Sequence, residues 1–123
     1  MKKLIIFGSL ALVFVFGAVA SESRIAAQDV IAGGYVDASV RDKDVRKAAN
    51  FAVTQRSKNV KRKFTLVSIR KAELQVVAGL NYRVCMRVRD NRGRVSTVTT
   101  VVYKGLKNRL SLSRWRSGGC SDI

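Results

Sequence analysis

The chain has 123 residues, of which 24 are lysine or arginine and 8 are aspartate or glutamate, giving a net charge of +16. This length allows one small domain. Because the chain has no histidine and only two cysteines, it lacks the base that a cysteine nucleophile usually needs and the four ligands of a structural zinc site. We therefore expect no enzyme activity, no metal site and no cofactor.

The first 20 residues have the features of a secretory signal peptide. Two lysines precede an almost wholly apolar run from Leu4 to Val19, and Ala18-Val19-Ala20 matches the small-x-small pattern of a cleavage site. A membrane anchor is the alternative, but the run is shorter than the roughly 20 residues that span a bilayer. Cleavage after residue 20 removes two lysines and no acidic residue, so residues 21–123 form a secreted domain with 22 basic and 8 acidic residues, a net charge of +14.

Secretion would place Cys85 and Cys120 in an oxidising environment, where pairing is the expected state of two cysteines. A domain of this size is only marginally stable from burial alone. We therefore predict a disulfide between the two cysteines, worth about 2–4 kcal/mol of stability.

One amphipathic helix is predicted over residues 40–57. Ser39 and Asp42 have the spacing of a capping box, and Asp44 adds negative charge near the helix start. Apolar residues then recur at helical spacing on one face, with polar and charged residues on the other. We expect the apolar face to pack on a core; it consists of Val45, Ala48, Ala49, Ala52 and Val53, broadened by Phe51.

After a basic connection at residues 57–63, the pattern becomes that of β-strands. The alternation slips at residues 68–72, which predicts a bulge or bend, and it is strictest from Leu80 to Arg89. One helix followed by strands in tight succession predicts an α+β domain, with an antiparallel sheet against the helix. The expected strands are residues 64–77, 80–89, 95–103 and 109–115, separated by turn residues at 90–93 and 104–108, and residues 24–32 could add an edge strand.

Residues 75–82 read QVVAGLNY, in which one strand ends and the next begins with almost no connection. Gly79 would permit the backbone conformation of a tight hairpin turn. Hairpin tips are normally polar, whereas Val76, Val77 and Ala78 would be exposed at this one unless a partner covers them. The tip therefore predicts a site that binds another protein.

Three segments of the chain resemble the secreted cystatins: Gly33–Ser39 before the helix, Val45–Val53 within it, and QVVAGLNY after it. The resemblance covers residues 33–120. It implies a five-stranded antiparallel sheet wrapped around one long helix, and reversible inhibition of papain-like cysteine proteases. Gly33 and Gly34 would lie along the non-primed subsites of the protease. The active-site cleft would accept the pentapeptide Gln75, Val76, Val77, Ala78 and Gly79.

The second hairpin loop departs from the cystatin pattern. Cystatins usually carry a Pro-Trp pair there, but this chain has no proline. The loop falls at residues 104–109, where Leu106 is the only apolar residue able to contact a protease. Trp115 belongs to the last strand, and we expect it to pack within the domain. Loss of the tryptophan contact should weaken binding, because aromatic residues often dominate an interface.

The cysteines and the residues after the helix also depart from the family. Cys85 lies one strand earlier than the usual partner of the C-terminal cysteine, so a disulfide to Cys120 would hold the C-terminal tail over the outer face of the sheet. The legumain-inhibiting segment of the family has no convincing match at residues 57–60. We do not transfer that activity.

The positive charge supports a second hypothesis. Basic residues cluster in the connection after the helix and along one strand face; they include Lys58, Lys61, Arg62, Lys63, Arg83, Arg87, Arg89, Arg92 and Arg94. A solvated basic surface is the simplest interpretation. The alternative is a cationic cystatin-fold domain that binds glycosaminoglycans or anionic membranes, in an antimicrobial role for example, with weak or no inhibition. Nucleic acid is a less favoured partner, because no basic groove with interleaved aromatic residues is visible. We expect a monomer.

Overall fold

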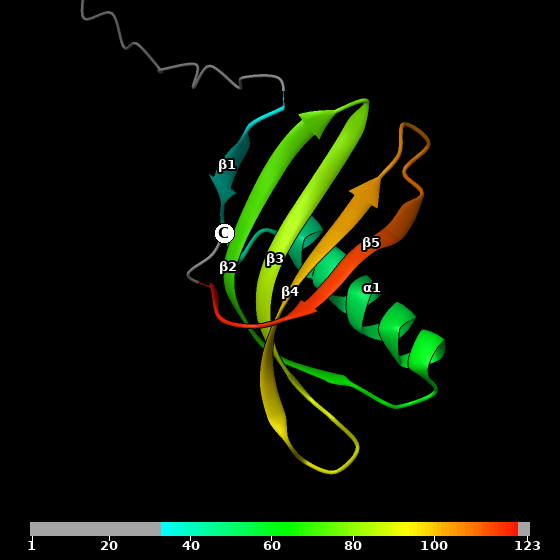
Figure 1. Cartoon of the computed structure of the whole chain (residues 1–123). Coiled ribbons are helices and arrows are strands. Elements are labelled where there is room, and N and C mark those ends of the chain that lie inside the picture. The colour runs from blue at the N-terminus through cyan, green and yellow to red at the C-terminus, as the bar shows by residue number, and fades with distance from the viewer. Residues whose placement is uncertain (1–32, 121–123) are drawn as a thin grey trace, which may run out of the picture.

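One helix packs against one face of a five-stranded antiparallel sheet in the computed structural model, which describes residues 33–120 (Figure 1). The strands lie in the sheet in the order in which they occur in the chain. The predicted α+β class, with an antiparallel sheet wrapped around one long helix, is therefore confirmed. The elements are β1 (Tyr35–Ala38), α1 (Lys43–Val60), β2 (Thr65–Val77), β3 (Gly79–Arg89), β4 (Val95–Lys104) and β5 (Leu110–Ser117).

Two expectations fall on parts of the chain outside the described residues. These are the signal peptide at residues 1–20 and the possible edge strand at residues 24–32. Among the described residues, the sheet edge beside β2 is formed by β1, whose pairing runs from Tyr35 opposite Gln75 to Ala38 opposite Ala72. No helix within residues 33–120 has the length and apolar character needed to cross a membrane.

The helix α1 begins three residues later than predicted, because its N-cap is Asp42 rather than Ser39. The Oδ1 atom of Asp42 accepts hydrogen bonds from the backbone N–H groups of Asp44 (2.8 Å) and Val45 (3.1 Å). The Oγ of Ser39 accepts instead from the N–H of Arg41, within the turn before the helix. Aspartate and serine cap helices about equally well, so the residue types alone did not distinguish the two positions.

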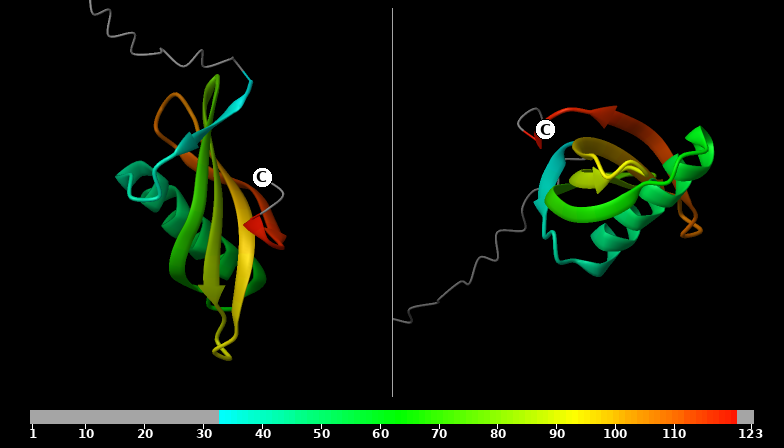
Figure 2. Two further views of the ribbon diagram at one scale, coloured as in Figure 1. Left: turned by 90° about the vertical axis from the view of Figure 1, so that its left-hand side faces the viewer. Right: turned by 90° about the horizontal axis from the view of Figure 1, so that it is seen from below.

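The core lies between α1 and the sheet, which curves around the helix (Figure 2). The buried helix residues are those that the periodicity predicted: Val45, Ala48, Ala49, Ala52 and Val53. The three alanines let the helix lie close to the strands, and a larger side chain there would overpack the core. The sheet contributes Tyr82, Val84, Met86 and Val88 of β3, together with Val98 and Val102 of β4.

The strand β2 is irregular where the predicted alternation slips. Its pairing with β3 shifts between Leu66 and Ser68 and again between Ile69 and Lys71, so the predicted bulge is confirmed. Bulges bend a strand and increase its twist, which fits the curvature of the sheet around α1. Beyond Lys71, the pairing of β2 with β3 is continuous up to the hairpin turn.

Asp90 closes the turn between β3 and β4. Its Oδ1 accepts hydrogen bonds from the backbone N–H groups of Arg94 (3.0 Å) and Arg92 (2.8 Å). These bonds, chiefly the one from Arg94, lower the pKa of the Asp90 carboxyl from its ordinary value. The carboxylate therefore stays charged, and the turn stays closed, to a lower pH than for a free aspartate.

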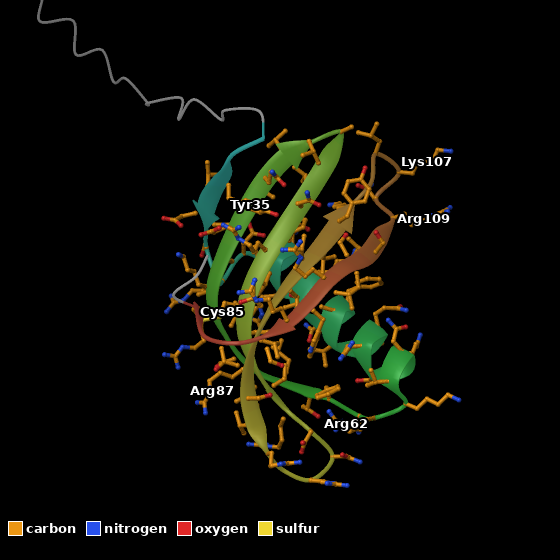
Figure 3. The ribbon with its side chains drawn as sticks, viewed as in Figure 1. Tyr35, Arg62, Cys85, Arg87, Lys107 and Arg109 are labelled. Atoms are coloured by element: carbon orange, nitrogen blue, oxygen red, sulfur yellow. A yellow bond between two sulfur atoms is a disulfide. The ribbon has the colours of Figure 1, made fainter. Side chains whose placement is uncertain are left out.

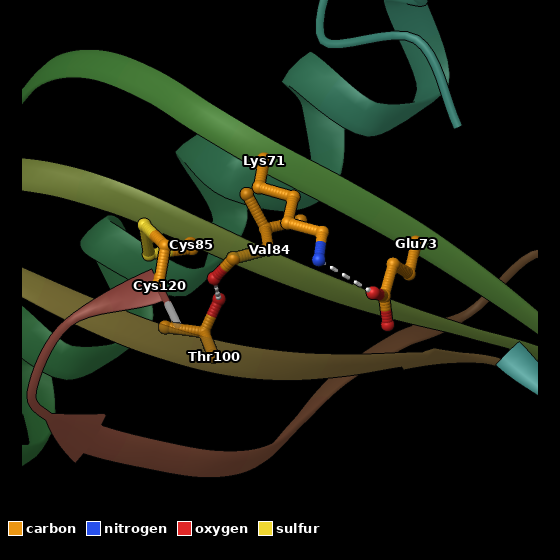
Figure 4. Close-up of a disulfide and its surroundings, with 6 residues drawn as sticks. All are labelled: Lys71, Glu73, Val84, Cys85, Thr100 and Cys120. Carbon is orange, nitrogen blue, oxygen red and sulfur yellow. Dashed lines mark hydrogen bonds and ion pairs between the residues drawn. A yellow bond between two sulfur atoms is a disulfide. The ribbon is translucent and has the colours of Figure 1, made fainter. Parts of the chain in front are cut away.

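The predicted disulfide between Cys85 and Cys120 is present, with a Cα–Cα distance of 5.6 Å (Figure 4). Cys85 is fully buried and lies on the outer side of β3, opposite the core residues Val84 and Met86. The backbone N–H of Gly118 donates to the carbonyl of Thr97 at 3.1 Å. Together these two links hold the C-terminal tail over the outer face of the sheet.

We expect Cys120→Ser to lower the free energy of unfolding by about 2–4 kcal/mol, because the cross-link no longer restricts the unfolded chain. Urea unfolding of wild type and variant, each with and without reductant, measures this. Reductant should shift the midpoint of the wild type to that of the variant and leave the variant unchanged. Equal midpoints for oxidised wild type and variant would contradict a stabilising role.

Candidate functional site

Three segments that are distant in sequence lie at one end of the sheet, as Figures 1 and 2 both show. They are the chain leading into β1, the hairpin between β2 and β3, and the loop between β4 and β5. We call this end the hairpin edge and define it by Gly33–Gly34, Gln75–Gly79 and Lys104–Arg109. The structure thus brings together every protease-binding residue that the sequence predicts.

The β2–β3 hairpin is as tight as its sequence suggests. Strand pairing continues to Val77 opposite Gly79, so Ala78 alone connects the strands. Gly79 has a φ of +115°, which side chains strongly disfavour. A Cβ at this position would also lie 2.4 Å from the carbonyl oxygen of Lys104 and 3.0 Å from the ring of Tyr103. Both the backbone conformation and the close approach of β4 therefore require glycine.

The tip of the hairpin is apolar, exposed and braced. Val76 and Val77 keep 38% and 39% of their surface accessible, and Ala78 is exposed as well. The hydroxyl of Tyr103, on β4, donates a hydrogen bond to the carbonyl of Ala78. Sequence reasoning assigned no role to Tyr103. The tip thus presents apolar side chains on a backbone that is already ordered, which favours binding.

Gln75 connects the hairpin to the chain before β1. Its Nε2 donates to the carbonyl of Gly33 at 2.7 Å, and its Oε1 accepts from the Nδ2 of Asn81 at 2.8 Å. Asn81 was not among the predicted site residues. The hairpin register offered a signal for it, because Gln75 and Asn81 face each other across the two strands. The bond to Gly33, between residues 42 positions apart, could not be read from a local pattern.

Side chains on the outer face hold β1 against the sheet. The guanidinium of Arg83 lies 3.7 Å from the centre of the Tyr35 ring, a cation–π contact. Arg83 also donates to the carboxylate of Glu73, with one hydrogen bond of 2.9 Å, and Lys71 Nζ lies 3.3 Å from the same carboxylate (Figure 4). Glu73 is buried, and a buried carboxylate needs such cationic partners. This cluster fixes the position of Tyr35, and so the position of the chain between Gly33 and β1.

The β4–β5 loop exposes one large apolar side chain, that of Leu106, which is 84% accessible. Hydrogen bonds from Gly105 N–H to the Arg109 carbonyl and from Asn108 N–H to the Gly105 carbonyl, both 2.9 Å, hold the loop. Lys107 and Arg109 project from it into solvent (Figure 3). A hollow separates the loop from the hairpin tip, and its lining includes Ala78, Tyr103, Leu106 and Leu110.

Trp115 lies in β5 and packs within the domain, as predicted. The centre of its ring is 5.5 Å from the centre of the Phe64 ring. The guanidinium of Arg56 lies 5.6 Å from the centre of the Trp115 ring. The exposed large apolar residues at the hairpin edge are therefore Val76, Val77 and Leu106, whereas Trp115 is half-buried against the core.

Tyr82 of β3 is buried in the core beneath the hairpin edge, and its hydroxyl stays uncharged at physiological pH. Burial raises the pKa of the Tyr82 hydroxyl, and the negative charges of Asp44 and Asp42 raise it further. Within residues 33–120, no group of three or more His, Cys, Asp or Glu side chains could hold a metal ion. The edge therefore offers a partner apolar contact area on an ordered frame, with the cationic side chains of Lys107 and Arg109 beside it.

Comparison with known proteins identifies the family. The family model SQAPI, aspartic acid proteinase inhibitor, matches residues 38–115. Salivary cystatin-L2 of Ixodes scapularis is 31% identical over 126 aligned residues, which cover 85% of this chain and 92% of that protein. The chain belongs to the cystatin family. L-cystatin of Tachypleus tridentatus is 45% identical over 56 residues, and this match spans 44% of the present cystatin and 42% of L-cystatin.

Solved structures share the fold of this cystatin. The salivary cystatin of the soft tick Ornithodoros moubata has a TM-score of 0.63 at 21% identity, covering 72% of this chain and 100% of the tick protein. Mialostatin, a gut cystatin of the hard tick Ixodes ricinus, has a TM-score of 0.62 at 14% identity, and the match covers 70% of this chain and 98% of mialostatin. The family is one of protease inhibitors rather than enzymes.

Gly79→Ala should destabilise the protein more than Gly93→Ala does. Both glycines have positive φ, +115° and +80°, but a Cβ at Gly93 meets no atom within 4 Å. Gly93→Ala therefore measures backbone strain alone, about 1 kcal/mol. Gly79→Ala adds the clash with the Lys104 carbonyl, so we expect at least 1 kcal/mol more, measured by urea unfolding. Equal losses would show that β4 does not constrain the turn.

Gln75→Ala should loosen β1 without unfolding the domain, because it removes the bond to the Gly33 carbonyl. One net hydrogen bond corresponds to about 2- to 10-fold faster amide exchange, measured by NMR for Tyr35–Ala38. Asn81→Ala is the matched control, since it removes the second bond of Gln75 but leaves the bond to Gly33. Exchange in β1 that is the same in wild type and Gln75→Ala would contradict the link.

Proposed function

We propose that this cystatin is a secreted, reversible inhibitor of papain-like cysteine proteases. The observation that carries the proposal is the hairpin tip, where Val76, Val77 and Ala78 are exposed on a turn that Gly79 and Tyr103 hold in one conformation. Exposed apolar residues on such a rigid projection are suited to a concave apolar cleft.

In the proposed complex, the hairpin tip enters the active-site cleft and blocks access to the catalytic cysteine. Val76, Val77 and Ala78 lose their contact with water there, and burial of apolar surface contributes roughly 25 cal/mol per Å². Little conformational entropy is lost, because the tip is already ordered. No covalent bond is formed, so inhibition is reversible.

Gly33 and Gly34 would lie along the non-primed subsites, where glycine lets the backbone approach the protease closely. Gln75 links Gly33 to the hairpin. The two segments would therefore reach the protease in a fixed relative position, which lowers the entropy cost of binding both.

The β4–β5 loop would supply the third contact, through Leu106. A single leucine buries less surface than a tryptophan, and aromatic residues are over-represented among the residues that dominate interfaces. The hairpin tip would therefore contribute a larger share of the binding energy here than in cystatins that carry a Pro-Trp pair.

Secretion is supported by the signal-like residues 1–20, by the Cys85–Cys120 disulfide and by the salivary and gut cystatins that this chain resembles. The alternative function, a cationic domain with weak or no inhibition, is not favoured, because the relatives place the chain in a family of protease inhibitors.

Titration of residues 21–123 against papain tests the proposal, with Val77→Ala and Val67→Ala as a matched pair. The two valines lie toward opposite ends of β2 and are similarly exposed, 39% and 41%. Val77→Ala should raise the inhibition constant about 5- to 30-fold, the range of a contact worth 1–2 kcal/mol. Val67→Ala should leave it unchanged.

Further variants test the other segments. Gly79→Glu, truncation before Tyr35 and Leu106→Ala should each weaken inhibition of papain. An aspartic protease serves as the comparison enzyme, because the matching family model is described as an aspartic acid proteinase inhibitor; we expect no inhibition of it. Absence of papain inhibition at micromolar concentration of the wild type would refute the proposal.

A further inference from the structure

The outer face of the sheet, opposite α1, carries a group of arginines from β3 and β5. Buried Val84, Met86 and Val88 point to the core, so the alternate residues of β3 point outward. The register places Arg114 in line with Arg83 through Val101, and Arg116 in line with Cys85 through Thr99. We call this surface the arginine face and define it by Arg83, Arg87, Arg89, Arg114 and Arg116.

A small pocket lies within the arginine face. It is lined by Arg83, Arg114 and Arg116, by Thr99 and Val101 of β4, by Ser117 at the end of β5, and by Gly118 and Gly119 of the tail. Its volume of about 70 Å³ is several times the roughly 10–15 Å³ that a cavity needs to hold one water molecule. It therefore has room for a small oxyanion group.

The tail forms one wall of this pocket, and the fold holds the tail there. The Cys85–Cys120 disulfide fixes its end, and the bond from Gly118 N–H to the Thr97 carbonyl fixes its start. The cationic groups therefore surround a shaped site, which distinguishes this surface from a set of independent solvated arginines.

Most of the positive charge on this face is not neutralised within the described part of the chain. No ion pair there involves Arg87, Arg89, Arg114 or Arg116. Arg83 is paired with Glu73 at the margin of the pocket. One other carboxylate in the paired strands faces the outer side of the sheet, that of Asp37, which lies opposite Glu73 on the edge strand β1. The face thus combines a strongly positive potential with guanidinium groups, whose planar donors match the oxygens of sulfate and phosphate groups.

We propose that the arginine face binds a sulfated polysaccharide. Arg114, Arg116 and the hydroxyl of Thr99 hold one sulfate group in the pocket. Arg87 and Arg89 contact further sulfates along β3, where residues two apart are spaced by about 7 Å. A linear polyanion suits this arrangement, because one charged group enters the pocket while its neighbours follow the strand.

The distribution of apolar residues favours a polysaccharide over a membrane. Surfaces that bind anionic membranes usually add apolar side chains that insert below the headgroups. Here the exposed apolar tip residues Val76 and Val77 and the loop residue Leu106 lie at the hairpin edge. Of the exposed large apolar residues of the described chain, the register places Val95 on the arginine face, and Val77 on the same side of the sheet but at its hairpin end. Because the two surfaces are separate, a polysaccharide-bound molecule keeps its hairpin edge free, and this proposal does not depend on protease inhibition.

Heparin affinity of residues 21–123 tests the proposal with a pair of double variants. Arg114→Gln/Arg116→Gln removes two charges from the pocket, and Lys58→Gln/Lys61→Gln removes two charges from the end of α1. The pocket variant should bind heparin at least about 10-fold more weakly at 150 mM salt, and the control within about 3-fold of wild type. Cys120→Ser, which frees the tail, should also weaken binding, as should replacement of heparin by desulfated heparin.

Two results would overturn the proposal. Equal weakening by both double variants would mean that net charge, and not the pocket, attracts heparin. Tighter binding to phosphatidylserine vesicles than to heparin at the same salt would assign the face to a membrane. The urea-unfolding midpoint of the pocket variant should equal that of wild type, which shows that this variant is folded whether or not the protein inhibits papain.

Discussion

The register between β2 and β3 determines most of the surface features of this cystatin. Pairing is continuous from Lys71 opposite Cys85 to Val77 opposite Gly79. This one alignment puts Gln75 across from Asn81 and Glu73 across from Arg83. A shift of one residue would move every one of these side chains to the opposite face. The turn, the link to Gly33 and the disulfide would then be lost together.

Strand β4 holds the tight turn between β2 and β3. Gly79 fits only because it has no side chain beside the Lys104 carbonyl, and Tyr103 bonds to Ala78. The hairpin tip is therefore braced by a third strand rather than standing free, as an isolated two-stranded hairpin would. This bracing explains how an exposed apolar tip can keep one conformation in water.

The fold separates two kinds of surface. The hairpin edge gathers exposed apolar side chains, and the outer face of the sheet gathers arginines, with Glu73 between Arg83 and Lys71. The alternation of β3 produces this separation, since its inward residues form the core while its outward residues remain free to carry charge. The disulfide stabilises the domain and also places the tail over the arginines of the outer face.

Local patterns in the sequence determined the helix face, the alternation of β3, the bulge in β2, the Gly79 turn and the pairing of the only two cysteines. Each of these features depends on residues close in sequence, except the disulfide, for which each cysteine has only one possible partner. The choice of Asp42 over Ser39 as the cap, and the position of the four-residue strand β1, depended on which hydrogen bonds form in three dimensions. Only the tertiary structure could join Gln75 to Gly33, Tyr103 to Ala78 and the tail to the arginine face, because these contacts connect segments whose proximity is set by strand order and register.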